Sequence, residues 1–289
     1  LLNSLLNHAT NLIQNRWQQY KKNTSMYRGF NLVIPETLND SFTEKGKEIH
    51  SEMTEKINDR FDDLIAFNGI INGNKVIEKW FPIIECDIFL SHSHKDRDKA
   101  IALAGLLYKN FGLKTFIDST VWGFSDKLLK AIDNKYCMHE NQTTYSYEKR
   151  NFSTSHVHLM LNSALNKMID SCEAIFFLNT PNSVSAIDTI KDSTNSPWIF
   201  SEIATTQTIR KKTPKRLKQE TRTFSSRISL SESVKEQLTV EYELELSHFT
   251  KLTLRDIQLW INKAKFSNSN PLDELYSLNQ INSKFLIDG

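Results

Sequence analysis

Residues 86–91 read CDIFLS, a short segment whose apolar side chains follow one another without alternation. Two more segments share this pattern, LKTFID at 113–118 and EAIFFLN at 173–179. Strands that are apolar at consecutive positions are covered on both faces, as in a parallel sheet. The three segments therefore predict parallel strands inside an α/β domain.

Between these strands the apolar residues recur at helical spacing. One such stripe runs over 100–111, where Gly112 can end the helix, and another runs over 157–169, with an expected start near Ser153. Strands that alternate with helices predict a flavodoxin-like, doubly wound parallel sheet, in which ligands gather beyond the carboxyl ends of the strands.

The composition gives no sign of a nucleic-acid-binding, membrane-spanning or disulfide-rich protein. The chain has 39% hydrophobic and 24% charged residues, and its net charge of +2 is too small to argue for a nucleic-acid or membrane surface. It has no run of about 18 apolar residues and no signal pattern at its start, so a cytoplasmic location is expected. Cys86, Cys137 and Cys172 form no C-x-x-C pair and are expected to be small buried hydrophobes in a reducing compartment.

The sequence also suggests a division of the chain. Apolar stripes at helical spacing run over 2–20 and 49–64, so residues 1–80 are predicted to form a helical extension. Residues 81–289 then form the α/β domain, with an insertion at about 121–152 that is rich in Tyr, Asn, Lys and His. A connection of that length is expected to be a lid or a mobile excursion.

Polar residues follow each predicted strand. Ser91, His92 and Ser93 follow the first strand, Asp118 ends the second and Asn179 ends the third. Because parallel strands end at one edge of the sheet, these side chains are expected to lie close together. A solvated loop histidine is an equally good interpretation of His92 and of His94. His156 and His158 are expected to be ordinary residues near a helix start, with the alternative that the insertion folds them towards the site.

The segment SPWIFSEIA at 196–204 lies just beyond the third strand. Ser196 is a good N-cap and Pro197 suits the first helical position, so Trp198 and Glu202 are expected one turn apart on the same face. That face can overlook the strand ends. The alternative is that Trp198 belongs to the core and Glu202 only complements the helix dipole.

These segments carry a resemblance to a known family. CDIFLSHSHKDRDKAIALAGLL resembles the first strand, loop and helix of TIR (Toll/interleukin-1 receptor) domains, and GLKTFIDSTVW resembles their second strand and the start of the BB loop. ALNKMIDSCEAIFFLN followed by SPWIFSEIA resembles their helix B, strand C and W-C-x-x-E helix, with Ile199 in place of the cysteine. The likeness covers roughly 85–210 and is strongest to bacterial TIR proteins of antiphage systems.

The resemblance implies an NAD+-cleaving enzyme in which Glu202 is the catalytic residue. NAD+ would be the substrate, with no cofactor and no metal. The leaving nicotinamide is cationic in the substrate and departs neutral, so the reaction needs negative charge near the developing oxocarbenium ion rather than a general acid. The residues expected to bind the substrate are Ser91, His92, Ser93, Asp118, Trp122, Asn179 and Trp198.

Several alternatives stay open at this point. The resemblance also implies a homo-oligomer, formed through TIR surfaces and the amino-terminal helices, and a partner protein in a defence system. The same surfaces would serve a non-catalytic TIR interaction module, and a nucleoside deoxyribosyltransferase-like enzyme is a further possibility. Trp122 has the alternative of closing the hydrophobic core. The product, whether linear, cyclic or base-exchanged ADP-ribose, is undetermined.

Overall fold

A computed structural model describes residues 28–34, 40–55, 71–184, 192–209 and 241–285 of the chain. These residues form an all-parallel five-stranded sheet in the order β3-β2-β4-β1-β7. The strands are β1 (Arg28–Val33), β2 (Ile88–Ser91), β3 (Thr115–Ile117), β4 (Ala174–Asn179) and β7 (Thr250–Thr253). The prediction of an α/β fold with a parallel sheet is confirmed, and β2, β3 and β4 are the three strands that the sequence predicts.

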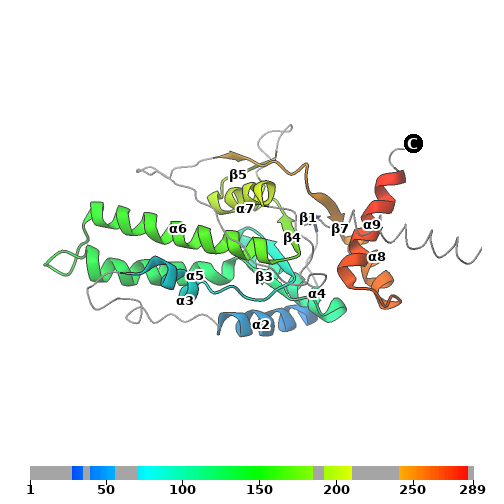
Figure 1. Ribbon diagram of the computed structural model, residues 1–289, viewed down its shortest axis with the longest axis horizontal. Helices are drawn as coiled ribbons and strands as arrows, with labels where there is room; N and C mark the ends of the chain where they lie inside the picture. The colour runs from blue at the N-terminus through cyan, green and yellow to red at the C-terminus, as the bar shows by residue number, and fades with distance from the viewer. Residues whose placement is uncertain (1–27, 35–39, 56–70, 185–191, 210–240, 286–289) are drawn as a thin grey trace, which may run out of the picture.

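Helices cover both faces of this sheet (Figure 1). Side chains of β2 and β4 alternate between two apolar clusters of the described residues, with Leu90 and Phe176 in one and Phe89 and Phe177 in the other. The first cluster contains residues of α4 (Arg97–Phe111), α8 (Leu254–Lys265) and α9 (Pro271–Phe285). The second contains residues of α3 (Gly73–Trp80), α5 (Ser119–Ile132), α6 (Tyr147–Ser171) and α7 (Pro197–Thr208).

The predicted boundary near residue 80 is wrong. β1 lies between β4 and β7 and pairs with both, so residues 28–33 are part of the centre of the sheet. Helix α2 (Asp40–Thr54) packs against α4 so closely that a Cβ on Gly105 would lie 1.9 Å from the carbonyl oxygen of Phe42. The predicted helix over 2–20 lies outside the described residues.

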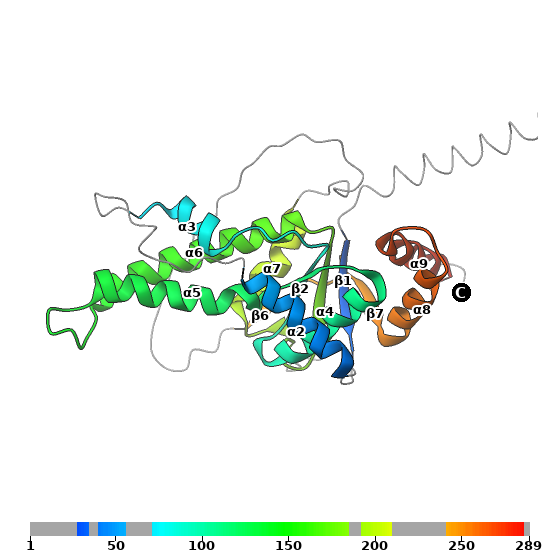
Figure 2. The same ribbon diagram turned by 90° about the horizontal axis from the view of Figure 1, so that it is seen from below.

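The predicted insertion at 121–152 is a helical hairpin rather than a loop. Helix α5 continues into a π-helical turn (Asp133–Cys137), and α6 begins at Tyr147, where the side chain of Ser146 accepts a hydrogen bond from the backbone N–H of Lys149. The N-cap of α6 therefore lies about two turns before the earliest predicted one, Ser153. Figures 1 and 2 both show α5 and α6 side by side and extending beyond the sheet.

Buried polar contacts fix the bend of this hairpin. Asp133 accepts hydrogen bonds from Ser153 Oγ at 2.5 Å and from Arg150 Nε at 2.9 Å, and Cys137 lies beside Ser153 in the same buried cluster. A carboxylate with two donors tolerates burial, so Asp133 can hold α5 to α6 without a hydrophobic contact at that point.

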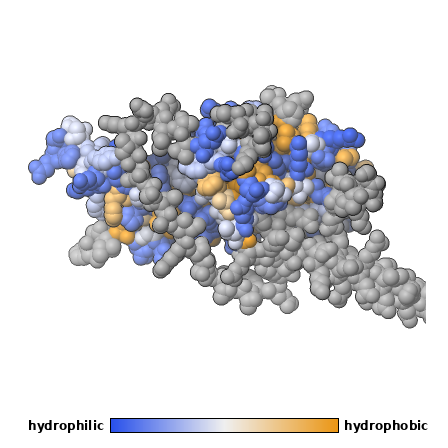
Figure 3. Space-filling model, turned by 90° about the horizontal axis from the view of Figure 1, so that it is seen from above, coloured by the Kyte–Doolittle hydropathy of each residue, from blue (hydrophilic) through white to orange (hydrophobic). Residues whose placement is uncertain are grey.

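The remaining elements frame α7. β5 (Ser193–Thr194) pairs antiparallel with β6 (Tyr242–Glu243), and the ring of Phe200 on α7 stacks on Tyr242 at 4.7 Å. No helix of the described residues has the length and apolar character that a membrane span requires. On the face drawn in Figure 3, hydrophobic side chains form separate patches among hydrophilic ones.

Candidate functional site

The site begins where β2 and β3 end beside α7. Helix α7 starts at Pro197, after Ser196 Oγ accepts a hydrogen bond from the N–H of Ile199, and this start places Glu202 on the inner side of the second turn. Ser91, the last residue of β2, donates a hydrogen bond from Oγ to Glu202 Oε2 at 2.6 Å. Both side chains are buried, and only 3% of Glu202 is exposed.

Asp118, at the end of β3, lies in the same buried group. Its Oδ1 accepts a hydrogen bond from the N–H of Ser119 at 2.7 Å, which fixes the carboxylate at the start of α5. Nδ1 of His92 lies 2.5 Å from the same oxygen, but the contact does not have the geometry of a hydrogen bond. The sequence-based expectation that these strand-end residues gather at one edge is met for Ser91, His92 and Asp118.

Several polar atoms of this group have no hydrogen-bond partner among the described residues. They are Oε1 of Glu202, Oδ2 of Asp118, Nε1 of Trp122, Nε2 of His92 and Nδ1 of His92, whose contact with Asp118 lacks hydrogen-bond geometry. Buried polar atoms are nearly always hydrogen-bonded in folded proteins, and a concentration of unsatisfied ones marks a place for water or a ligand. Unsatisfied donors and acceptors are both present, so the group can bind a ligand that carries hydroxyl or amide functions.

The surroundings change the acidity of Glu202. Burial raises its pKa well above the ordinary value, and the negative charge of Asp118 raises it further. A hydrogen bond that Glu202 can donate to Asp118 only when Glu202 is protonated acts in the same direction. The hydrogen bond from Ser91 opposes this effect by favouring the charged form. Strongly perturbed pKa values are concentrated at functional sites, so this buried carboxyl group is a candidate functional residue.

Aromatic rings form a group at the starts of α5 and α7. The indoles of Trp122 on α5 and Trp198 on α7 have their centroids 5.8 Å apart, and both rings are half-buried. His94 stacks on Trp122 at 6.1 Å, and His158 of α6 meets Trp198 edge-on at 5.5 Å. Trp122 and Trp198 also pack against the second apolar cluster, so the expected site role and the expected core role are both compatible with their position.

Two predicted site residues do not join the group. Ser93 is buried at the start of the short 3-10 helix His94–Asp96, and its side chain makes no capping hydrogen bond. Asn179 ends β4 in register with Val33 of β1, and within the described part of the chain it has no contact with Glu202 or Asp118. Their predicted roles in binding remain predictions.

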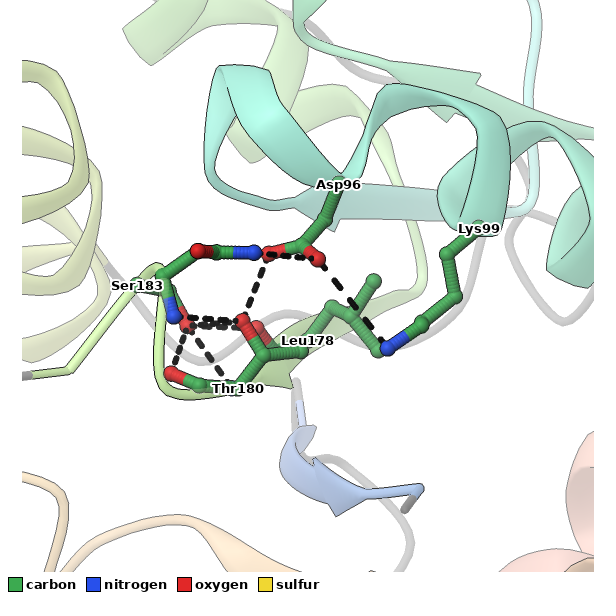
Figure 4. A network of polar contacts seen from close by, with 6 residues as sticks. Asp96, Lys99, Leu178, Thr180 and Ser183 are labelled. Carbon is green, nitrogen blue, oxygen red and sulfur yellow. Dashed lines mark hydrogen bonds and ion pairs between the residues drawn. The ribbon is translucent and has the colours of Figure 1, made fainter. Parts of the chain in front are cut away.

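A second polar network, which the sequence analysis did not single out, joins the loops after β2 and β4 (Figure 4). Asp96 is buried and accepts hydrogen bonds from Thr180 Oγ1 at 2.5 Å and from Asn182 Nδ2 at 3.0 Å. Ser183 Oγ accepts from the N–H of Thr180 and donates to the carbonyl of Leu178. This network fixes the two loops relative to each other next to the site, and the polar run NTPNS at 179–183 was its only sequence signal.

A pocket of about 340 Å³ lies between these loops and the start of α7. Its lining is polar and contains one cation, and it consists of Lys95, Pro181, Asn182, Ser183, Thr194, Asn195 and Ser196. Hydroxyl and amide groups near a helix start, together with a lysine, suit an anionic group of a ligand.

His50 on α2 is a further residue near the site. Burial lowers its pKa, and the charges of Arg97 and His92 lower it further. Its Nε2 has no hydrogen-bond partner in the described ranges. His50 was not expected near the site from the sequence, because residues 1–80 were predicted to form a separate extension.

Among the described residues, no group of three His, Cys, Asp or Glu side chains is arranged to hold a metal ion. Comparison with known proteins adds no assignment. No protein-family model matches the chain, and neither a curated protein nor a solved structure is significantly similar to it.

Proposed function

We propose that this protein cleaves the bond between ribose and nicotinamide in NAD+, with Glu202 as the catalytic residue. The observation that supports this proposal best is a buried carboxyl group, held by Ser91 through Oε2, whose Oε1 has no partner among the described residues. The resemblance to TIR domains names the reaction, and Trp198, one turn before Glu202 on α7 and in contact with Trp122, is compatible with it.

The chemistry requires one well-placed negative charge. The C1′–N bond breaks with its electron pair on the nicotinamide nitrogen, so the cationic ring leaves as a neutral molecule and positive charge develops on the ribose. A carboxylate that is already oriented in a buried site stabilises this charge more than one in water would. Ser91 orients Glu202 for this role, since it engages only one of the two carboxylate oxygens.

The raised pKa of Glu202 fits a cationic substrate. Burial and the charge of Asp118 favour the protonated form of Glu202 in the protein by itself. A bound nicotinamide ring brings a positive charge next to the carboxyl group, and an opposite charge within a few ångströms favours ionisation. Binding is therefore expected to release a proton from Glu202 and to leave the carboxylate charged where the reaction needs it.

The surroundings provide places for the rest of the dinucleotide. Trp122 and Trp198 can cover the flat nicotinamide ring, because aromatic faces favour offset stacking with such rings. The polar pocket at the start of α7, with Lys95 in its lining, suits the pyrophosphate. Ribose hydroxyls would meet the unpartnered oxygens of Glu202 and Asp118.

The test is nicotinamide release from NAD+ by the purified protein, with the products identified by mass. We expect Glu202→Gln to lose about 10² to 10³ in rate, the usual cost of removing one oriented electrostatic group. Glu78→Gln is the matched control, because Glu78 is exposed on α3, and it is expected to retain wild-type activity. Equal turnover of a folded Glu202→Gln protein would contradict the proposal.

A second candidate function follows from the same pKa shift. A carboxyl group that keeps its proton can donate it to a neutral base, which is the requirement for cleaving a nucleoside rather than NAD+. A nucleoside deoxyribosyltransferase-like reaction would appear in the same assay as base release from a deoxynucleoside with no turnover of NAD+.

The cellular setting remains part of the proposal. A role in bacterial antiphage defence, a cytoplasmic location, a partner protein and self-association through TIR surfaces rest on the resemblance alone. The α5–α6 hairpin extends beyond the sheet and is the element on which we would place a lid or an assembly contact (Figure 2).

A further inference from the structure

The two carboxyl groups of the site share a pattern of contacts. Glu202 engages Oε2 with Ser91, and Asp118 engages Oδ1 with the N–H of Ser119 and the nearby ring of His92. The second oxygen of each, Oε1 and Oδ2, is buried and has no hydrogen-bond partner in the described part of the chain. Each carboxyl group is thus held by one oxygen and open at the other.

We propose that Asp118 is a second catalytic residue, which accepts the proton of the oxygen nucleophile that attacks the ribose. This inference rests on the proposed NAD+ cleavage and adds a role that a single glutamate does not fill. Glu202 stabilises the developing cation, while Oδ2 of Asp118 activates the water or hydroxyl group that captures it.

The position of Asp118 suits a proton acceptor. None of its side chain is exposed. Oδ1 contacts the N–H of Ser119 on α5 and the ring of His92 in the loop after β2, and these two contacts fix the direction of Oδ2. The backbone places Asp118 next to the residue that holds Glu202: the N–H of Asp118 donates to the carbonyl of Leu90 at 3.5 Å, and Ser91, the next residue of β2, donates to Glu202. A base must lie within hydrogen-bonding reach of the proton it removes, so a nucleophile bound beside Glu202 would lie close to Asp118.

The charged and titratable groups around Asp118 come from several elements. Glu202 of α7 retains its own proton more strongly because of the charge of Asp118. His92 contacts Asp118 from the loop after β2, and the charges of His92 and of Arg97 of α4 in turn act on His50 of α2. One proton shared between two carboxyl groups leaves one of them available as a base.

Every bond, electron pair and proton of the proposed step has a destination. The C1′–N bond breaks and its electron pair stays on the nicotinamide nitrogen, which becomes neutral. The nucleophile oxygen forms a bond to C1′, and its proton moves to Oδ2 of Asp118 and from there to bulk water. A pyridine nitrogen or an azide ion that attacks C1′ carries no proton to remove, so capture by these nucleophiles does not need Asp118.

This difference gives a direct test in Asp118→Asn. We expect hydrolysis and cyclisation of NAD+ to fall by about 10² to 10⁴, the usual contribution of a general base. Exchange of nicotinamide for an added pyridine base should stay within a few-fold of wild type, and azide should restore turnover with a ribosyl azide product. Asp126→Asn is the matched control, because Asp126 is exposed on α5 about two turns after Asp118. It is expected to hydrolyse NAD+ as the wild type does.

The outcomes separate the two proposals. A wild-type protein that does not cleave NAD+ contradicts the proposed function itself. The role of Asp118 alone is overturned if the wild-type protein cleaves NAD+ and Asp118→Asn hydrolyses it at the normal rate. It is also overturned if Asp118→Asn loses base exchange as strongly as it loses hydrolysis. Glu202→Gln should lose hydrolysis and exchange together and should not respond to azide.

A measurement on the wild-type protein keeps the test independent of how Asp118→Asn folds. The ratio of hydrolysis to base exchange is measured across acid pH. If Asp118 accepts the proton, the ratio of hydrolysis to exchange falls toward acid pH, because only hydrolysis needs the base. A ratio that stays constant overturns the inference.

Discussion

At the scale of single residues, the site contains buried polar groups that its neighbours only partly satisfy. Glu202, Asp118 and His92 are almost completely buried, and each has at least one polar atom without a partner among the described residues. Such groups lower the stability of a fold, by about 1 to 3 kcal/mol for each unsatisfied atom. We interpret this cost as the consequence of keeping hydrogen-bonding capacity ready for a ligand.

The pKa shift of Glu202 predicts how stability and pH are linked. Because the folded protein raises this pKa, it binds the proton more tightly than the unfolded chain does. The resulting stabilisation is complete below the ordinary pKa of 4.5 and is lost as the pH rises through the higher pKa of the folded state. A glutamine cannot ionise, so Glu202→Gln should be more stable than wild type above that pKa, by roughly 1 to 3 kcal/mol.

Thermal unfolding at acid pH and at pH 8 checks this prediction. The midpoint difference between Glu202→Gln and wild type should be largest at pH 8 and should shrink toward acid pH. Glu78→Gln, at an exposed position, should show no such trend. A Glu202→Gln protein that is less stable than wild type at pH 8 would show that the carboxylate is paired in the fold and would remove the argument for its raised pKa.

The sequence predicted part of this group for a definite reason. Ser91, His92 and Asp118 follow consecutive apolar segments, and parallel strands must end at one edge of the sheet. The N-cap and proline at the start of α7 predicted the face on which Glu202 lies, and the resemblance to TIR domains implied its role. His50 and Asp96 were not predicted, because their positions depend on how α2 and the loop after β4 pack, and no local pattern encodes that packing.

At the scale of elements, strand β1 and the start of helix α6 were both missed for the same reason. A local sequence pattern does not show which other element a segment packs against. β1 reads RGFNLV, and its polar Asn31 and its Gly29 interrupt the apolar run that identified the other strands. Gly29 is required there, since a Cβ would lie 2.2 Å from the ring of Phe249. The polar tip of the α5–α6 hairpin likewise hid a helix start, which is set by Ser146.

The contact between α2 and α4 gives a stability prediction. A Cβ on Gly105 would lie 1.9 Å from a backbone oxygen of Phe42, and a backbone atom cannot move aside as a flexible side chain can. We expect Gly105→Ala to destabilise the protein by about 1 to 3 kcal/mol, as overpacked cores do, or to prevent folding. Denaturant unfolding measures the change.

Gly123 of α5 is the matched control. No atom lies within 4 Å of a Cβ at this position, so Gly123→Ala adds only helix propensity and should stabilise the protein by about 1 kcal/mol. Opposite signs for the two substitutions are the expected result. A Gly105→Ala protein as stable as Gly123→Ala would mean that α2 does not pack on α4 as described.

At the scale of the whole molecule, the sheet joins segments that are far apart in the chain. β1 and β7 pair although more than 200 residues separate them, and β1 also pairs with β4. Figures 1 and 2 show the α5–α6 hairpin at one end of the molecule and α8 and α9 at the other, with the sheet between them. The candidate site lies on the hairpin side of the sheet, because Asp118, Trp122 and His158 belong to the hairpin or to its start.

This connectivity predicts that the amino-terminal part cannot be removed. A chain shortened to begin at residue 81 lacks β1, α2 and α3, and the loss of β1 separates β7, α8 and α9 from β4. Phe30 and Leu32 are fully buried, and losing such side chains costs about 2 to 5 kcal/mol each, against a total stability of about 5 to 15 kcal/mol for a typical domain. We expect this chain to be insoluble or to show no cooperative thermal transition, whereas one that begins at residue 24 retains every described element and should unfold cooperatively. Circular dichroism and thermal unfolding of the two chains decide the matter: a cooperative, wild-type transition for the chain that begins at residue 81 would contradict the central position of β1.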